Sequence, residues 1–315
     1  MIDFNNQQAP SFRELELRCE MEFRELGNCW HIFTPEKFPV VFGTRDDFKF
    51  GMNLIAVCAK VFPDIRILTF EIMTNHLHLT VAGQEERVRS FFRMLCEYLS
   101  VYLKRTDRPM DLSGWDRPPR LISDLNDARN VIAYNNRNGY LVNPGETPFT
   151  YPWGANRFFF NPELRRFHES SESRLTLRQL REMFHTRSLD SYNGMKTVDG
   201  YVTPVSFCDI GAAERLFRNA HHYYYKVSRD VEGHKNLATE IGEGVFYTDE
   251  ELFAVVATKC RAEYNVASAS LLPRDAKIQM ARSLYYEYNA GSGKIARLLK
   301  LDRSVVDALF PVGRK

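Results

Sequence analysis

Residues 71–82, EIMTNHLHLTVA, place His76 and His78 two positions apart in a run that is typical of a β-strand. Alternate residues of a strand project from one face and each advances the chain by about 3.3 Å, so the two imidazoles should stand roughly 6–7 Å apart at the backbone. This spacing suits one divalent cation, and imidazole is the commonest metal-donating side chain. Such a pair is more often only a surface or hydrogen-bonded rim, so a metal site needs further ligands elsewhere.

The segments around the histidine pair follow one another in a regular order. The predicted elements are a strand at 29–34, a helix at 44–62, a strand at 65–73, the histidine strand after a hairpin at Thr74-Asn75, a helix after Gly83, an edge strand at 120–123 and a helix at 124–138. This order predicts an α+β fold with a split βαβ, ferredoxin-like antiparallel sheet, covered by helices and with the histidine strand central. Gly139 is expected to cap the last helix.

Two of these helices carry further signals. The helix after Gly83 is predicted to bury one apolar face, made of Val88, Phe91, Phe92, Leu95, Leu99 and Leu103. The later helix contains RNVIAYNNRNG at 129–139, in which Tyr134 and Asn138 are four residues apart and share a face. If that face meets His76 and His78, the Asn138 amide becomes a third ligand and the Tyr134 hydroxyl lies close by. A site of this kind can transfer a phosphoryl group to tyrosine, with Mg²⁺ or Mn²⁺ offsetting the developing charge.

The two motifs resemble those of a known family. TNHLHLTV (74–81) is similar to the PNHxHLLV motif of the REP-associated tyrosine transposases, in the single-tyrosine HUH transposase superfamily, and YNNRNGYLV (134–142) is similar to their YIxxNPxxxGLV motif. The resemblance covers roughly residues 29–153. It departs from the family at Thr74 and Gly139, where proline is usual, and at Tyr140, a second nearby tyrosine.

The resemblance implies an HUH nuclease fold and a catalytic role for four residues. His76 and His78 would be metal ligands, Asn138 a third ligand, and Tyr134 the nucleophile that forms a 5′-phosphotyrosine link. Mg²⁺ or Mn²⁺ is the implied cofactor. The implied activity is cleavage and rejoining of single-stranded DNA beside hairpin-forming palindromes, by a monomer or a homodimer.

The C-terminal part has a different pattern, that of an all-α region. Thr248 with Glu251 predicts a helix start, and KIARLL (294–299), a three-residue turn and RSVVDALF (303–310) form a helix-turn-helix pattern. An ordinary helical bundle gives the same hydrophobic pattern. Residues 273–310 resemble the duplex-binding domain of DnaA-type replication initiators, which implies that Lys300, Arg303 and Ser304 meet DNA.

Length and composition set the broader limits. The 315 residues allow three parts: a catalytic domain at 1–155, a helical linker region at 156–245 and a helix-turn-helix domain at 246–315. A net charge of +2 does not by itself indicate a nucleic-acid binder. Six cysteines without any CxxC pair, no long apolar run and no signal-peptide pattern favour a cytoplasmic protein without a membrane partner.

Three functions stay open at this level. The first is the metal-dependent transposase that acts through Tyr134. The second is a transposase-derived DNA-binding regulator without catalytic activity. The third is a metal-dependent enzyme acting on small phosphates, which the absence of a Gly-rich phosphate loop disfavours. The basic, Pro-rich stretch 105–120, with Trp115, is either a solvated loop or a contact for a nucleic-acid backbone.

Overall fold

A computed structural model describes residues 10–141, 149–171, 176–184, 195–241 and 247–310. The chain divides into two compact units, Met1–Val227 and Ser228–Lys315. The stretch 156–245, predicted as a separate linker region, is therefore shared between them, with 156–227 in the first unit. Among the helices of the described residues, none is long and apolar enough to cross a membrane.

The first unit is α+β. Its strands are β1 (Cys29–Phe33), β2 (Arg66–Ile72), β3 (Leu77–Ala82), β4 (Arg120–Ile122), β5 (Thr197–Val198) and β6 (Tyr201–Val202). Its helices are α1 (Phe12–Leu26), α2 (Arg45–Val61), α3 (Glu85–Arg105), α4 (Leu125–Leu141), α5 (Pro162–Glu169), α6 (Leu177–Phe184), α7 (Ile210–Arg215) and α8 (Ala220–Arg229), of which α8 runs two residues past the division.

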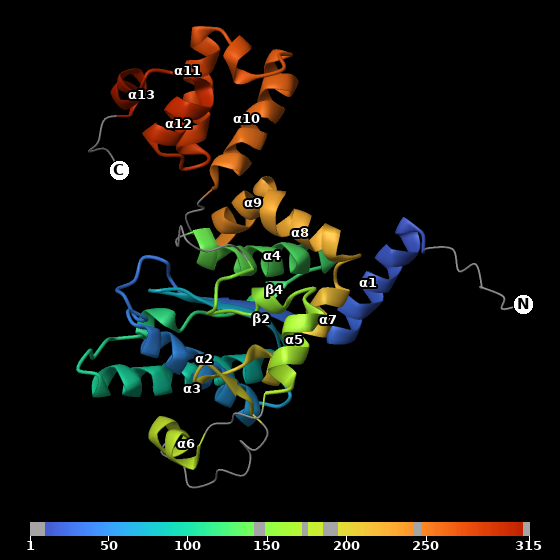
Figure 1. Cartoon of the computed structure of the whole chain (residues 1–315), viewed down its shortest axis with the longest axis vertical. Coiled ribbons are helices and arrows are strands. Elements are labelled where there is room, and N and C mark those ends of the chain that lie inside the picture. The colour runs from blue at the N-terminus through green and yellow to red at the C-terminus, as the bar shows by residue number, and fades with distance from the viewer. Residues whose placement is uncertain (1–9, 142–148, 172–175, 185–194, 242–246, 311–315) are drawn as a thin grey trace, which may run out of the picture. The chain divides into compact units, whose positions relative to one another are not determined.

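A four-stranded antiparallel sheet lies at the centre of this unit. The strand order is β2-β3-β1-β4, so β3 is an inner strand, as predicted for the histidine strand. Figure 1 shows α2 and α3 against one face of the sheet and α4 against the other. Side chains of β3 therefore point alternately towards α4 and towards the pair α2 and α3.

The predicted features of the two helices α2 and α3, which pack on this sheet, are confirmed. Thr44 and Asp47 form a reciprocal capping box at the start of α2. The buried face of α3 consists of the six predicted residues. Helix α1, which was not predicted, begins with a capping box between Ser11 and Glu14.

The outer edge of β2 is covered by two later segments. Trp153 accepts a hydrogen bond from the backbone of Ile72, and Gly154 forms an antiparallel bridge with Glu71. Further along the strand, Cys208 forms a parallel bridge with Ile67. Segments around residues 153–154 and 208 thus lie along this edge of the sheet.

The prediction that Gly139 ends its helix was wrong, because α4 continues to Leu141. The glycine is required for close packing: a Cβ at this position would overlap the ring of Tyr151 and the carboxyl group of Glu71. Glycine here lets the last turn of α4 approach β2. The side chain of Tyr140 lies outside the described residues.

We expect Gly139→Ala to lower the free energy of unfolding of the first unit by about 2–3 kcal/mol, because an added methyl group meets atoms that cannot move freely. Thermal unfolding of the full chain measures the effect. Gly211→Ala is the matched control, since Gly211 is also helical and its added Cβ would meet only the end of the Arg215 side chain. Equal stability of Gly139→Ala and the unaltered protein would contradict this account of the packing.

The second unit is all-α. Its helices are α9 (Val231–Ile241), α10 (Asp249–Tyr264), α11 (Arg274–Tyr286), α12 (Ser292–Leu299) and α13 (Arg303–Leu309). The predicted capping box between Thr248 and Glu251 is present at the start of α10. Helices α10 to α13 share one hydrophobic core, to which Leu284, Leu299 and Val306 belong. The turn between α12 and α13 spans three residues, as predicted.

Candidate active site

His76 and His78 stand side by side at the start of β3. Their ring centroids are 5.1 Å apart, with the ring planes nearly perpendicular. His76 is 7% exposed and His78 is fully buried. The backbone of His76 also accepts a hydrogen bond from Met73 across the hairpin that precedes the strand. The tight hairpin and the inner strand thus hold both rings on one face.

The structure brings Tyr134 to this pair. Helix α4 packs on β2 and β3, and the ring of Tyr134 meets His78 edge-on, with 5.7 Å between the ring centroids. The Tyr134 side chain is only 2% exposed. The predicted meeting of this helix face with the histidine strand is therefore present for Tyr134 and His78.

Asn138 lies one turn further along α4 and is partly buried. Its backbone N–H and that of Gly139 donate hydrogen bonds to the carboxyl group of Glu71. Glu71 stands opposite His78 in the register of β2 and β3. This backbone contact holds Asn138 over the strand pair that carries the histidines.

Glu71 is one functional candidate that sequence reasoning missed. Its carboxyl group is fully buried, and burial raises its pKa well above the ordinary value, although the two backbone N–H groups of α4 oppose that rise. Glu71 therefore ties α4 to β2 at the level of His78.

His31 of β1 is the second missed residue. It lies in the predicted strand 29–34, where no role was assigned to it; its Nε2 lies 3.2 Å from Nδ1 of His78, and the two rings stack with their centroids 5.5 Å apart. Asn135 of α4 donates from Nδ2 to the Thr80 hydroxyl, 2.8 Å away, on the same face. The site is thus a buried polar layer between α4 and three strands.

Burial keeps the imidazoles of this layer neutral. It lowers the pKa of His31 to about 3 and that of His76 to about 4, and in His31 the nearby Arg120 lowers it further. Burial also places the pKa of His78 well below its ordinary value, with a smaller effect from His76. Neutral imidazole keeps the nitrogen lone pair that a metal ion needs.

The donor set fits a divalent cation only with a ligand beyond the histidines. In the described residues, no group of three or more His, Cys, Asp or Glu side chains is arranged to hold a metal ion. His76 and His78 could supply two nitrogen donors; the His76 Nδ1 lies 2.8 Å from Asn75 Oδ1, so Nε2 is the nitrogen with which His76 would coordinate. An amide oxygen such as that of Asn138 would supply the missing donor type.

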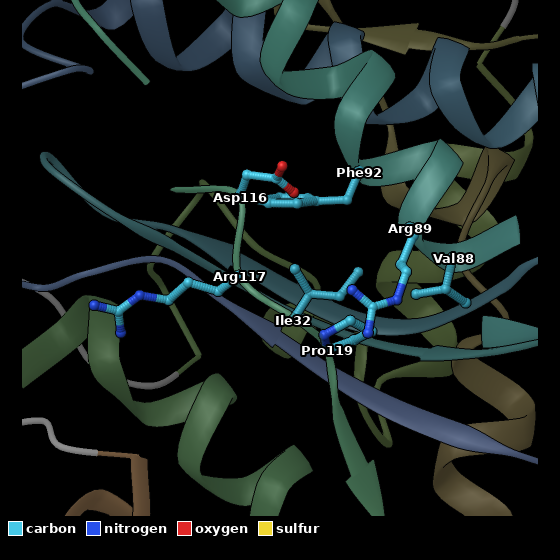
Figure 2. Close-up of a pocket in the computed structure, with 7 residues that line it drawn as sticks. All are labelled: Ile32, Val88, Arg89, Phe92, Asp116, Arg117 and Pro119. Carbon is cyan, nitrogen blue, oxygen red and sulfur yellow. The ribbon is translucent and has the colours of Figure 1, made fainter. Parts of the chain in front are cut away.

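A small pocket lies against the opposite face of the sheet. Figure 2 shows Val88, Arg89 and Phe92 extending from α3 above Ile32 of β1. Ile32 follows His31 in the strand and so points away from the histidines. The pocket has a volume of about 10 Å³, room for roughly one water molecule, so it is no site for a nucleotide.

The stretch 105–120 is held by the protein itself. Arg108 contacts Asp47 at 2.5 Å, and Arg120 contacts Asp127 at 3.1 Å. Trp115 is fully buried, so it offers no exposed ring for stacking with a base. These contacts favour a structural loop over a nucleic-acid contact for this stretch.

The three predicted DNA-contacting residues lie between α12 and α13. Lys300 is exposed and has a left-handed backbone conformation, with φ of 50°. Arg303 is 75% exposed and lies 3.5 Å from Asp307. The exposed Ser304 hydroxyl donates to Asp302, 2.6 Å away, at the start of α13.

Comparisons with protein-family models, curated proteins and solved structures gave no match to this chain.

Proposed function

We propose that the protein is a metal-dependent DNA-cleaving and -joining enzyme that acts on hairpin-forming single-stranded DNA through Tyr134. The observation that carries the proposal is the edge-on contact between Tyr134 of α4 and His78 of β3, with His76 alongside. The sheet order β2-β3-β1-β4, with α2 after β1 and α3 after β3, also supports a ferredoxin-like HUH fold. The motif resemblance at 74–81 and 134–142 supplies the reaction class.

The proposed reaction conserves the number of phosphodiester bonds. The Tyr134 oxygen bonds to phosphorus while the bond to the 3′ oxygen of the preceding nucleotide breaks, and that oxygen takes up a proton. The same steps in reverse rejoin the DNA without nucleotide hydrolysis. A Mg²⁺ or Mn²⁺ ion, when bound, would polarise the phosphate and offset its developing charge.

The chain's own residues have three parts in this proposal. His76 and His78 would hold the cation together with Asn138. Glu71 would keep the last turn of α4 in place through the backbone N–H groups of Asn138 and Gly139. Because free tyrosine has a pKa near 10, the site must also accept the proton of Tyr134.

Burial favours a second candidate function. Tyr134 is 2% exposed and His78 is fully buried, so the described conformation offers the hydroxyl little access to DNA. A transposase-derived regulator could keep the same residues as a structural layer and bind DNA through its helix-turn-helix. Catalysis by Tyr134 would require a conformational change that exposes its hydroxyl to DNA.

One experiment separates the two candidates. The full chain is incubated with Mn²⁺ and a panel of single-stranded DNA hairpins, then analysed under denaturing conditions for a covalent protein–DNA adduct. An adduct that forms only with Mn²⁺ or Mg²⁺ supports the enzyme. Absence of any adduct across the panel, together with tight duplex binding, would favour the regulator.

For duplex binding, we expect the double variant Lys300→Asn, Arg303→Gln to weaken binding roughly 10-fold and to reduce its salt dependence, because two phosphate-contacting charges are removed. Asparagine at 300 tolerates the left-handed backbone conformation. Fluorescence anisotropy at several salt concentrations measures the effect. Arg297→Gln is the control, since Arg297 contacts Asp249 at 2.5 Å. An unchanged salt slope in the double variant would refute the predicted contact.

A further inference from the structure

We infer that His31, oriented by Asn135, is a positioning residue that fixes the proton of His78 on Nδ1 and so presents Nε2 of His78 to a divalent cation. The inference rests on the proposed function, because it assigns two further residues to the same cation site. His31 lies outside both motifs quoted above, and Asn135 lies within the helix motif at 134–142, where only Tyr134 and Asn138 were assigned a role.

The imidazole rings of His31 and His78 are in direct contact. His31 of β1 is fully buried and stands opposite Thr80 of β3, two residues beyond His78 on the same face. Its Nε2 is 3.2 Å from Nδ1 of His78, and the rings are inclined by only 20°. The contact is therefore a hydrogen bond between imidazoles.

Such a bond between neutral imidazoles has two possible proton arrangements. In the first, Nδ1–H of His78 donates to His31, and Nε2 of His78 keeps its lone pair. In the second, Nε2–H of His31 donates, so His78 carries its own proton on Nε2 and cannot bind a metal ion there. The role of His31 depends on which arrangement the surroundings favour.

Asn135 favours the first arrangement. Its Nδ2 donates a hydrogen bond to the Thr80 hydroxyl, so Oδ1 of the same amide can accept a hydrogen bond from another group. Asn135 Oδ1 and His31 Nδ1 are both buried without a hydrogen-bond partner in the described residues, and both side chains lie beside Thr80, which stands opposite His31 across the sheet and accepts from Asn135. An acceptor at Nδ1 keeps the His31 proton there and leaves Nε2 to accept from His78.

His76 also carries its proton on Nδ1, because of a different neighbour. Its Nδ1 lies 2.8 Å from the side-chain oxygen of Asn75, an acceptor, so the proton is on Nδ1 and the lone pair on Nε2. Both histidines of the strand would therefore use Nε2 as the coordinating atom. Residues that hydrogen-bond to the ligands of a metal ion commonly determine the affinity of the site for the metal.

The test measures Mn²⁺ binding to the full chain by electron paramagnetic resonance titration. We expect His31→Leu to weaken Mn²⁺ binding about 10- to 100-fold, because the acceptor for Nδ1–H of His78 is lost. We expect His31→Gln to keep most of the affinity for Mn²⁺, since the glutamine amide oxygen can accept the hydrogen bond from Nδ1–H of His78. Mn²⁺ binding by His31→Leu as tight as that of the unaltered protein would overturn the inference.

His168→Leu controls for a merely structural effect. His168 is also buried, and its Nδ1 lies 2.8 Å from the Thr203 hydroxyl, outside the histidine layer. Both leucine variants should lower the unfolding temperature, but only His31→Leu should weaken Mn²⁺ binding. Equal weakening by both variants would reduce His31 to a structural residue and overturn its positioning role.

The tautomer can be read directly from long-range ¹H–¹⁵N spectra of the metal-free protein. We expect His78 with its proton on Nδ1, and a mixture of tautomers in His31→Leu. A proton on Nε2 of His78 in the unaltered protein would overturn the inference while leaving the nucleophile untouched. If the unaltered protein binds no Mn²⁺, the inference and the cation site of the proposed function both fail. If the unaltered protein and His31→Leu bind Mn²⁺ equally well, only the inference fails.

Discussion

The full chain with Tyr134→Phe is expected to form no covalent adduct with hairpin-bearing single-stranded DNA, a loss of roughly 10⁴-fold or more in the rate of adduct formation. Phenylalanine keeps the ring that packs edge-on against His78 and removes only the oxygen that would bond to phosphorus. DNA binding should therefore persist while cleavage disappears. Denaturing gel electrophoresis with end-labelled DNA measures both the adduct and the cleaved strand.

Two further variants sharpen this result. Tyr102→Phe is the control, because its hydroxyl donates to Asp47, 2.7 Å away, at a distance from the histidine layer, so adduct formation should continue. Tyr140→Phe tests the second tyrosine of the motif. An adduct that persists in Tyr134→Phe and disappears in Tyr140→Phe would transfer the nucleophile to position 140.

Replacing His78 is expected to have an effect of similar size. His78→Ala should abolish cleavage, by roughly 10³-fold or more, because loss of a cation ligand removes several kcal/mol of charge stabilisation at the phosphate. His76→Ala should act in the same way. Duplex binding through the second unit should be unchanged, and electrophoretic mobility shift with duplex DNA checks this in the same preparations.

Burial of His78 requires a stability control, since alanine leaves a cavity beside Tyr134. His78→Leu fills more of that space and offers no donor atom, so it should also lack cleavage, while His168→Ala removes a buried histidine elsewhere and should cleave normally. Thermal unfolding of all three variants separates instability from loss of the cation site. Full cleavage by His78→Ala would remove the cation from the proposed reaction.

The regular elements of the first unit could be predicted well from local patterns. The capping box at Thr44, the apolar face of α3 and the short edge strand β4 depend on neighbouring residues only, and each is present in the structure. The pairing of Tyr134 with His78 was also expected, since each residue lies on a predictable face of its own element. The backbone of Asn138 contacts Glu71, opposite His78, and the role of its side chain as a ligand stays a prediction.

The remainder of the site depends on contacts between distant segments. Gly139 looks like a helix end locally, and only the approach of Tyr151 and Glu71 explains it. The strands carry polar residues at alternate positions, such as Thr69 and Glu71 or His78 and Thr80, a pattern that ordinarily marks a solvent-facing side of an antiparallel sheet. Here α4 covers that side, so the polar residues form a buried layer that a local pattern cannot reveal.

The segments that lie along the outer edge of β2 determine where the chain can be truncated. A fragment ending at residue 155, where the catalytic domain was predicted to stop, would lose the bridge between Cys208 and Ile67 and the hydrogen bond from Val202 to the buried Asn53. Open strand edges invite pairing with other chains. An autonomous fragment should therefore extend to about Val227, where the first unit ends, and shorter ones should aggregate on expression.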